Sequence, residues 1–278
     1  MTKAEKLRRL FKSNRLIRVA GAHNGVSAKL VEANGFDAVW ASGFEISTSH
    51  AVPDASILTM SELLEAARNM NESTTIPVIA DCDSGFGEVR NTKYMVRKYE
   101  AAGIAAVCIE DKRFPKLNSF VNGDQSLVSI DEFVEKLHGA KKAQTSPDFM
   151  VFARIEAFIA GLGIDEALAR AHAYADAGAD AILIHSKKRT SEQVFEFAHA
   201  WRNRIPTVIV PTTYYEVTTS DLEQVDVSMV IYANHAMRAA IKAMDQTLAG
   251  IIRTGTVSTV EQDIASMERV FELQGIVE

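Results

Sequence analysis

The sequence has few cysteines and no long hydrophobic run. Its two cysteines, Cys82 and Cys108, each lie inside a short apolar run, so we expect reduced packing residues rather than a disulfide. No stretch approaches the roughly 18 uninterrupted apolar residues that a membrane span needs. The N-terminal stretch MTKAEKLRRLF is charged and amphipathic, and it lacks the apolar core of a signal peptide. These absences predict a cytoplasmic protein that has no membrane partner.

An excess of positive charge is also missing. Lys and Arg together number 30 against 36 Asp and Glu, which gives a net charge of −6. A protein that binds nucleic acid through its phosphates needs a basic face, and no such face dominates here. The composition, with 47% hydrophobic and 24% charged residues, is that of an ordinary globular protein. We therefore expect no nucleic-acid partner.

Short apolar runs alternate with helical patterns along the whole chain. Between the runs, apolar residues recur at i, i+3, i+4 and i+7, the signature of amphipathic helices. Gly103 and Gly178 stand where two of these helices would end. Continuously apolar strands between helices predict a parallel sheet that is covered on its outside. The predicted strands span residues 16–21, 37–43, 77–83, 105–111, 150–156, 180–186, 207–212 and 228–234.

Eight such units without a long linker favour a (β/α)8 barrel of the TIM type over an open doubly wound sheet. No G-x-G-x-x-G motif follows the first apolar run, so a dinucleotide-binding fold would lack its phosphate loop. The chain continues beyond the eighth strand with further helical patterns. We predict one barrel domain over residues 1–278, with a C-terminal helical extension from about residue 236.

Carboxylates end two neighbouring strands of the predicted barrel. Asp81 and Asp83 close the third strand and Glu110 closes the fourth, at the barrel end where active sites form. Residues two apart on a strand share a face, and carboxylates held that close repel one another unless a cation neutralises them. Oxygen donors without His or Cys favour Mg²⁺ or Mn²⁺ over zinc. The sequence thus predicts a metal site, with a purely structural acid cluster as the alternative.

Other strand ends carry candidate substrate ligands. Arg154 follows an apolar run, where an unpaired guanidinium would be costly to bury, and its planar fork suits a carboxylate or phosphoryl group. The alternative for Arg154 is an ion pair with Glu156. His185 is either a ligand or a hydrogen-bonded core histidine. Trp40 is either a packing residue or a wall of the site, if the turn at residues 42–44 offers backbone N–H groups to an anion.

Six stretches together resemble a known superfamily. They are GAHNGVSAKLVEANGFDAVWASGFEIS, VIADCDSGFG, CIEDKRFPKLNS, ARIEAFIAGLG, GADAILIHSKK and VIYANHAMRAA. From about residue 15 to 275, the sequence resembles the phosphoenolpyruvate mutase/isocitrate lyase superfamily, and within it the branch of mutases and phosphonopyruvate hydrolases. The lyases of this superfamily carry Cys-Gly-His in the loop after strand four. That loop reads KRFPKLNSF here, which argues against carbon–carbon lyase activity.

The resemblance implies roles for these side chains. Asp81 matches the direct Mg²⁺ ligand, and the residues that hold the water shell of the ion are Asp54, Asp83 and Glu110. The groups that bind the substrate carboxylate or the rest of the substrate are Trp40, Ser42, Gly43, Phe44 and Ser119. The catalytic groups, some of them in a gating loop, are Asp54, Lys116, Asn118, Arg154 and His185. A homo-oligomer, dimer or tetramer, whose subunits exchange their C-terminal helices is implied by analogy.

Two activities of this branch fit the sequence, and they differ in whether water enters the site. The mutases carry Asn at position 118, whereas the hydrolase carries Thr, and this chain has Asn118. We therefore expect a Mg-dependent phosphoenolpyruvate mutase that forms a P–C bond in phosphonate biosynthesis. The stretches SGFEIS and AVPDASIL resemble the hydrolase, so release of pyruvate and phosphate from phosphonopyruvate is the alternative. A related carboxyphosphonoenolpyruvate chemistry and a barrel that only binds an anion or a partner are the other hypotheses.

Overall fold

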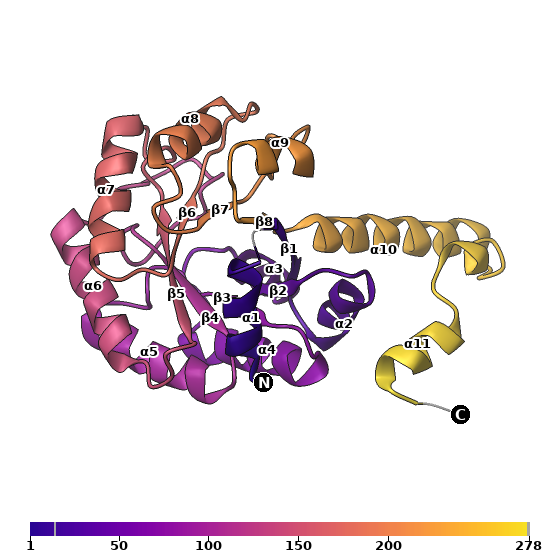
Figure 1. The fold of residues 1–278 in the computed structure, drawn as a ribbon. Coiled ribbons are helices and arrows are strands. Elements are labelled where there is room, and N and C mark those ends of the chain that lie inside the picture. The colour runs from indigo at the N-terminus through magenta and orange to yellow at the C-terminus, as the bar shows by residue number, and fades with distance from the viewer. Residues whose placement is uncertain (14, 277–278) are drawn as a thin grey trace.

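Eight parallel strands close into a barrel, in chain order, in the computed structural model, which describes residues 1–13 and 15–276 (Figure 1). Each strand pairs with the next one, and β1 closes the barrel against β8, with Ile17 beside Met229. The predicted (β/α)8 fold is confirmed. The strands are β1 (Ile17–Ala22), β2 (Ala38–Ala41), β3 (Val78–Asp81), β4 (Ala106–Glu110), β5 (Met150–Ile155), β6 (Ala181–Ile184), β7 (Thr207–Ile209) and β8 (Met229–Tyr232).

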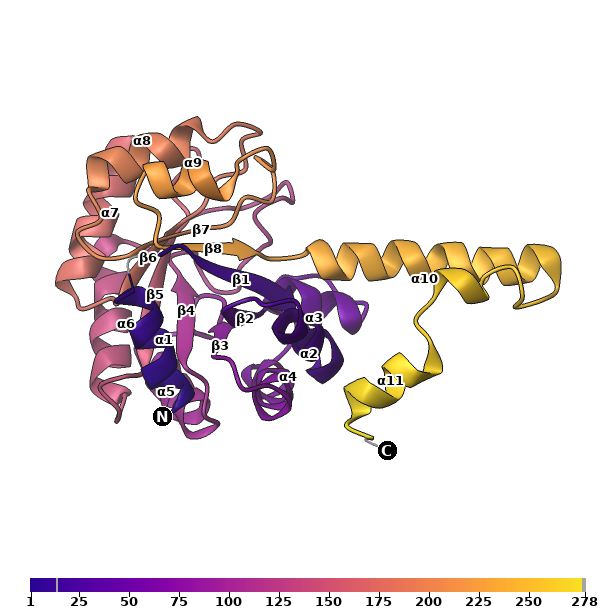
Figure 2. The ribbon, with the colours of Figure 1, turned by 45° about the vertical axis from the view of Figure 1, so that its right-hand side comes forward.

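Helices surround the barrel and follow the strands that they connect (Figures 1 and 2). Many begin at a side chain that caps the first turn; Thr59, for example, accepts from the backbone N–H of Glu62. Gly103 and Gly178 adopt positive φ just beyond helix ends, as predicted. The helices are α2 (Gly25–Ala33), α3 (Gly43–Ser49), α4 (Met60–Ser73), α5 (Val89–Ala101), α6 (Ile130–Ala143), α7 (Ile164–Asp176), α8 (Glu192–Trp201) and α9 (Thr219–Gln224).

Two apolar clusters hold the fold together. One lies between the strands and the surrounding helices, and the other fills the barrel interior. Helix α1 (Lys3–Phe11) adds Leu7 to the interior cluster, and the Phe11 ring meets the Phe152 ring edge-on at 5.8 Å between centroids. Each fully buried Leu, Ile or Phe side chain contributes about 1.5–3 kcal/mol. Cys82 and Cys108 are buried and free, as expected for packing residues.

Except for β1, the strands are shorter than the apolar runs that predicted them. Strand β3 ends at Asp81, and Asp83 lies beyond it with φ of 47°, in the left-handed region that Asp tolerates better than most residues. The inference that Asp81 and Asp83 share a face of one strand is therefore wrong. A turn after β3, rather than the strand period, brings the Asp83 carboxylate to the same end of the barrel.

The C-terminal helices leave the barrel. Helix α10 (His235–Thr254) projects outward, and after a short 3-10 turn (Glu261–Asp263) helix α11 (Met267–Gln274) runs back along the side of α2 (Figures 1 and 2). Lys29 of α2 donates to the Leu273 carbonyl at 2.6 Å. Several large apolar side chains of α10 are exposed, with Leu248 at 64% and Ile252 at 87%. The last part of the predicted extension, residues 277–278, lies outside the described residues.

Candidate active site

A cavity of about 70 Å³ lies at the C-terminal ends of the strands. It is lined by all of the predicted site residues except Gly43 and Asp83, which lie beside it. The structure therefore brings together side chains from seven of the strand ends and from two loops, one between α3 and α4 and one after β4. Further lining residues that the sequence did not single out as ligands are Phe120, Val210, Thr212, Ala233 and Asn234.

Carboxylates form one side of this cavity. The pKa of Asp81 is raised to about 7, chiefly by burial and also by the charges of Asp83 and Glu110, although Lys116 and Arg154 oppose the change. The pKa of Asp83 is raised for the same first reason, burial. Several acids held together without a cation therefore resist ionisation. This is the electrostatic condition that a bound cation relieves.

The donor set fits a hard divalent cation. Glu110 Oε1 is buried and has no hydrogen-bond partner, so an oxygen is left with unused bonding capacity. A Cβ added to Gly43 would lie 3.4 Å from Asp81 Oδ2, which shows how closely the backbone of the Ser42 turn approaches the acids. Within residues 1–13 and 15–276, no three His, Cys, Asp or Glu converge as a ready-made set of direct ligands. Mg²⁺ usually keeps several water ligands and binds through one or two carboxylates, so it does not require such a set.

Residues 113–126 form the loop that the resemblance predicts to be a gating loop, and it supplies a cation and an amide to the same acids. Lys116 Nζ lies 2.5 Å from Asp54 Oδ1 and 3.2 Å from Asp83 Oδ1. Asn118 Nδ2 donates to Asp54 Oδ2 at 2.7 Å, and the Lys116 backbone N–H donates to Ser56 Oγ. Burial alone would raise the pKa of Asp54, but Lys116 and Asn118 outweigh it and lower that pKa. The loop therefore lies closed over the cavity.

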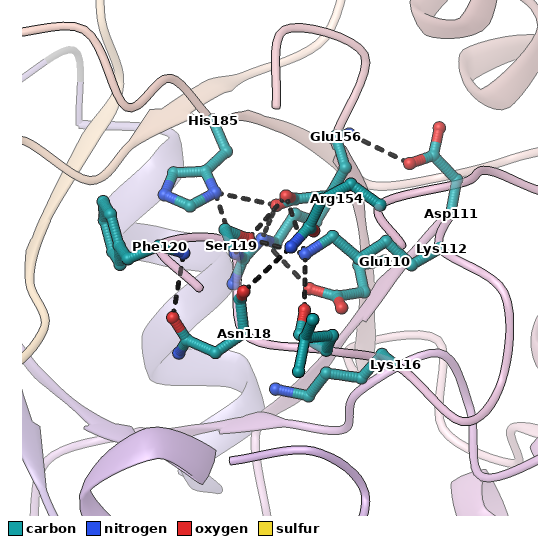
Figure 3. A network of polar contacts seen from close by, with 12 residues as sticks. Glu110, Asp111, Lys112, Lys116, Asn118, Ser119, Phe120, Arg154, Glu156 and His185 are labelled. Atoms are coloured by element: carbon teal, nitrogen blue, oxygen red, sulfur yellow. Dashed lines mark hydrogen bonds and ion pairs between the residues drawn. The ribbon is translucent and has the colours of Figure 1, made fainter. Parts of the chain in front are cut away.

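Arg154 is the centre of the opposite wall (Figure 3). Its Nε lies 2.5 Å from Glu156 Oε1 and 3.4 Å from Glu110 Oε2. The ion pair with Glu156, which was the alternative to a ligand role, is thus present. The guanidinium also lines the cavity, so the two interpretations are compatible. Burial works against the charge of Arg154, but Glu156, Glu110 and Asp81 outweigh it and hold the pKa of Arg154 above its usual value.

His185 follows β6 and is buried beside this pair. Its Nδ1 lies 2.8 Å from both Arg154 Nη2 and Glu156 Oε1, so it can accept from the guanidinium or donate to the carboxylate, but not both at once. Burial lowers the pKa of His185, with Arg154 and Lys112 adding to the effect and Glu156 opposing it. The imidazole is therefore neutral at physiological pH. It is both hydrogen-bonded and part of the cavity wall.

The Ser42 turn begins helix α3. Ser42 is its N-cap and accepts from the backbone N–H of Glu45 at 3.2 Å, while Gly43 and Phe44 form its first turn. Trp40 is packed in the barrel interior and also lines the cavity, so both interpretations of this residue hold in part. The free N–H groups at the start of a helix point towards an anion that binds there.

The comparison with known proteins gives the family. A family model described as phosphoenolpyruvate phosphomutase matches residues 7–252. The chain belongs to this family. It is 47% identical to a phosphonopyruvate hydrolase of Variovorax sp. (strain Pal2), over 99% of this chain and 96% of the relative.

Solved structures of both kinds of relative superimpose closely on this member of the phosphoenolpyruvate phosphomutase family. A phosphoenolpyruvate phosphomutase from Streptomyces platensis subsp. rosaceus is 52% identical with a TM-score of 0.97, over 98% of this chain and 95% of that one. A phosphonopyruvate hydrolase in complex with oxalate and Mg²⁺ is 46% identical with a TM-score of 0.94, over 99% and 95%. The likeness therefore establishes an enzyme family whose members include mutases and a hydrolase. In the described part of the chain, no helix combines the length and apolarity that crossing a membrane requires.

A buried network behind the site was not predicted in this family member. Asp111 accepts from the Glu156 backbone N–H at 2.9 Å, from Arg170 Nη1 at 3.0 Å and from Tyr174 Oη at 2.8 Å. It thereby ties the end of β4 to β5 and α7. Lys112, equally unforeseen, is buried next to Glu156 (Figure 3). The sequence signal was present, since two charged residues directly follow Glu110, but their partners lie far away in the chain.

Proposed function

We propose that the protein is a phosphoenolpyruvate mutase, which interconverts phosphoenolpyruvate and phosphonopyruvate. The observation that carries the proposal is Asn118, whose Nδ2 donates to Asp54 Oδ2 at 2.7 Å while its side chain lines the closed cavity. Asparagine at this position is what the resemblance associates with mutases. The partner Asp54 and the neighbouring Lys116 support the proposal, because together they hold the loop over the site.

The reaction requires donors more than a base. In phosphonopyruvate the P–C bond breaks, its electron pair forms the enolate of pyruvate, and the phosphoryl group then bonds to the enolate oxygen. The group in transit resembles metaphosphate, with its charge spread over its oxygens. Asn118, Arg154 and His185 lie around one cavity and provide N–H donors for those oxygens (Figure 3). The permanent charge of Arg154 in a buried site stabilises the developing oxyanion.

The acid cluster is proposed as the Mg²⁺ site, with Asp81 as the direct ligand and Asp54, Asp83 and Glu110 around it. When bound, the ion supplies Lewis-acid stabilisation of the enolate oxygen. The similar hydrolase solved with oxalate and Mg²⁺ supports this assignment. At the same end of the barrel, the Ser42 turn offers its helix N-terminus to the substrate carboxylate.

Exclusion of water separates a mutase from a hydrolase. The transferred group must return to the enolate before a water molecule reaches it, which favours a small closed cavity. Here Lys116, Asn118, Ser119 and Phe120 of the gating loop form part of the cavity wall. The hydrolase alternative is favoured by the 47% identity to the Variovorax protein. It would require the loop to admit and orient one water molecule.

The test is phosphorus NMR of the protein incubated with phosphonopyruvate and Mg²⁺. A growing phosphoenolpyruvate resonance is expected, while inorganic phosphate accumulating with pyruvate and without that resonance would establish the hydrolase instead. A parallel incubation that starts from phosphoenolpyruvate shows whether phosphate arises from that compound. The control is an Asp81→Asn variant, and no conversion by the wild-type protein would reject both reactions.

The C-terminal helices support a proposed homo-oligomer in which subunits exchange α10 and α11. Helix α10 projects from the barrel with Ile241, Met244, Leu248 and Ile252 exposed by 46%, 56%, 64% and 87%. A row of apolar side chains on a helix without a partner typically marks an interaction surface. We propose a dimer or tetramer whose subunits cover this row.

A further inference from the structure

A buried lysine stands at the fixed end of the gating loop. Lys112 is 2% exposed and follows β4 by two residues. Its backbone bridges to Leu127 in an antiparallel manner, and the Arg113 backbone N–H donates to the Ser126 carbonyl at 3.1 Å. These bonds close the stem of the loop. The position of Lys112 is therefore set by the barrel and by the stem, not by the part of the loop that covers the cavity.

The ammonium group of Lys112 reaches that covering part. Lys112 Nζ donates to the Leu117 carbonyl at 2.9 Å and to Ser119 Oγ at 2.7 Å. It also lies 3.4 Å from Glu156 Oε2, to which Ser119 Oγ donates at 2.7 Å. Lys112, Ser119 and Glu156 are all buried (Figure 3). The Ser119 side chain is thus hydrogen-bonded to both members of the Lys112–Glu156 ion pair, which joins the end of β4 to the end of β5.

The loop tip (residues 116–119) is held from two sides. Lys116 and Asn118 bond to Asp54, on the side of the acid cluster. The carbonyl of Leu117 and the hydroxyl of Ser119 bond to Lys112, on the side of Arg154 and Glu156. Alternate residues of the tip therefore use opposite anchors. The Asp54 anchor belongs to the proposed metal and substrate machinery, whereas Lys112 does not line the cavity.

We propose that Lys112 is a positioning residue that holds the gating loop closed and thereby controls how completely water is excluded from the phosphoryl group in transit. The part about water rests on the proposed mutase function, but the closure of the loop does not. Lys112 acts through the loop, since its contacts are Leu117, Ser119 and Glu156 rather than the cavity.

The physical reason is the cost of leaving a buried charge without partners. If the loop opens, Lys112 loses both loop acceptors and keeps only the Glu156 carboxylate at 3.4 Å. Glu156 itself is shared with Arg154 and His185. Burial would raise the pKa of Glu156, but Arg154, His185 and Lys112 together hold it well below its usual value. Losing one or two charge-assisted hydrogen bonds shifts an equilibrium by roughly 10- to 100-fold, so closure is favoured to about that extent.

The test compares Lys112→Met with a matched lysine elsewhere. Methionine keeps the unbranched apolar body of the side chain and removes the ammonium group, and with it the charge and the donors. The control is Lys141→Met, because Lys141 pairs with Asp180 at 2.7 Å at the other end of the barrel. Chymotryptic cleavage after Phe120, a loop residue that is 46% exposed, reports opening without depending on a lysine. Phosphorus NMR reports the ratio of phosphoenolpyruvate to phosphate formed from phosphonopyruvate.

For Lys112→Met we expect cleavage after Phe120 to rise about 10-fold or more and the phosphate fraction to increase, with Lys141→Met unchanged in both. Wild-type cleavage in a folded Lys112→Met protein would overturn the proposal. Faster cleavage with an unchanged product ratio would overturn the part about water. If the wild type itself forms only phosphate, the proposed mutase function fails, yet cleavage still decides the role of Lys112. Should Lys112→Met not fold, Lys112→Gln, which keeps a neutral donor, replaces it in both assays.

Discussion

Replacing Asn118 with alanine removes the contact on which the mutase proposal depends. The amide donates to Asp54 Oδ2 at 2.7 Å, and its oxygen accepts from the Phe120 backbone N–H at 3.0 Å. A hydrogen bond to a charged group contributes about 1.5–3 kcal/mol, which corresponds to roughly 10- to 150-fold. Because the same amide also faces the group in transit, we expect kcat/KM to fall by about 100-fold or more. The same bond is lost from the folded protein, so the free energy of unfolding should fall by no more than about 1.5–3 kcal/mol, and the barrel should stay folded.

Initial rates from phosphorus NMR and thermal unfolding measure the two effects separately. Asn118→Asp sharpens the test, because it keeps the shape of the side chain but places a carboxylate against Asp54, where like charges repel. We expect a larger loss than for alanine. Asn34→Ala is the matched control, as the Asn34 amide caps the end of α2 by donating to the Leu30 carbonyl at 2.8 Å. The proposed role of this amide would be refuted if Asn118→Ala turned over at the wild-type rate. It would also be refuted if Asn118→Asp were as active as Asn118→Ala.

Two further predictions concern the metal and the oligomer. The folded-state pKa of Asp81, about 7, exceeds its usual 3.8, so stability of the metal-free protein is lost as pH rises through this range. Mg²⁺ should therefore raise Tm more at pH 8 than at pH 6, and equal increases would contradict this reasoning. Leu248→Asp should reduce the molar mass measured by light scattering, whereas Gln246→Asp, on the same exposed helix, should not; an unchanged mass in both would count against helix exchange.

The barrel could be predicted because its signals are local. Each apolar run needs only its own neighbours to be read as a strand, and helix ends such as Gly103 carry their own backbone requirement. Strand ends could not be placed as well. The run 180–186 becomes a strand only over Ala181–Ile184, although His185 and Ser186 are buried as well. The His185 side chain lies against Phe120 and Glu156, which come from loops after other strands. The apolar composition of a run indicates that its residues are buried, but it does not indicate which elements bury them.

The same distinction explains what was missed in the site. Strand ends in a barrel converge, so polar residues there could be grouped without knowledge of the loops. Asp111 could not be understood in this way, because its partner Arg170 is 59 residues away on α7. Lys112 could not either, since its acceptors depend on the conformation of the closed loop. Charges whose partners come from distant elements look alike in the sequence, whether they are exposed or buried.

The stretch CIEDKRFPKLNSF unites these observations. Its acidic residues lie at the rigid end of β4, where Glu110 joins the acid cluster and Asp111 fixes the backbone of Glu156. Two of the cations that follow, Lys112 and Lys116, form contacts on opposite sides of the loop tip. In the closed loop the Lys116 ammonium group pairs with Asp54 of the acid cluster. The Lys112 ammonium group donates to the hydroxyl of Ser119 on the other side of the loop tip. Because the loop carries positive charge that pairs with the acids of the site, closing the loop is electrostatically favourable. Loop closure and the charge of the site are therefore coupled within thirteen consecutive residues.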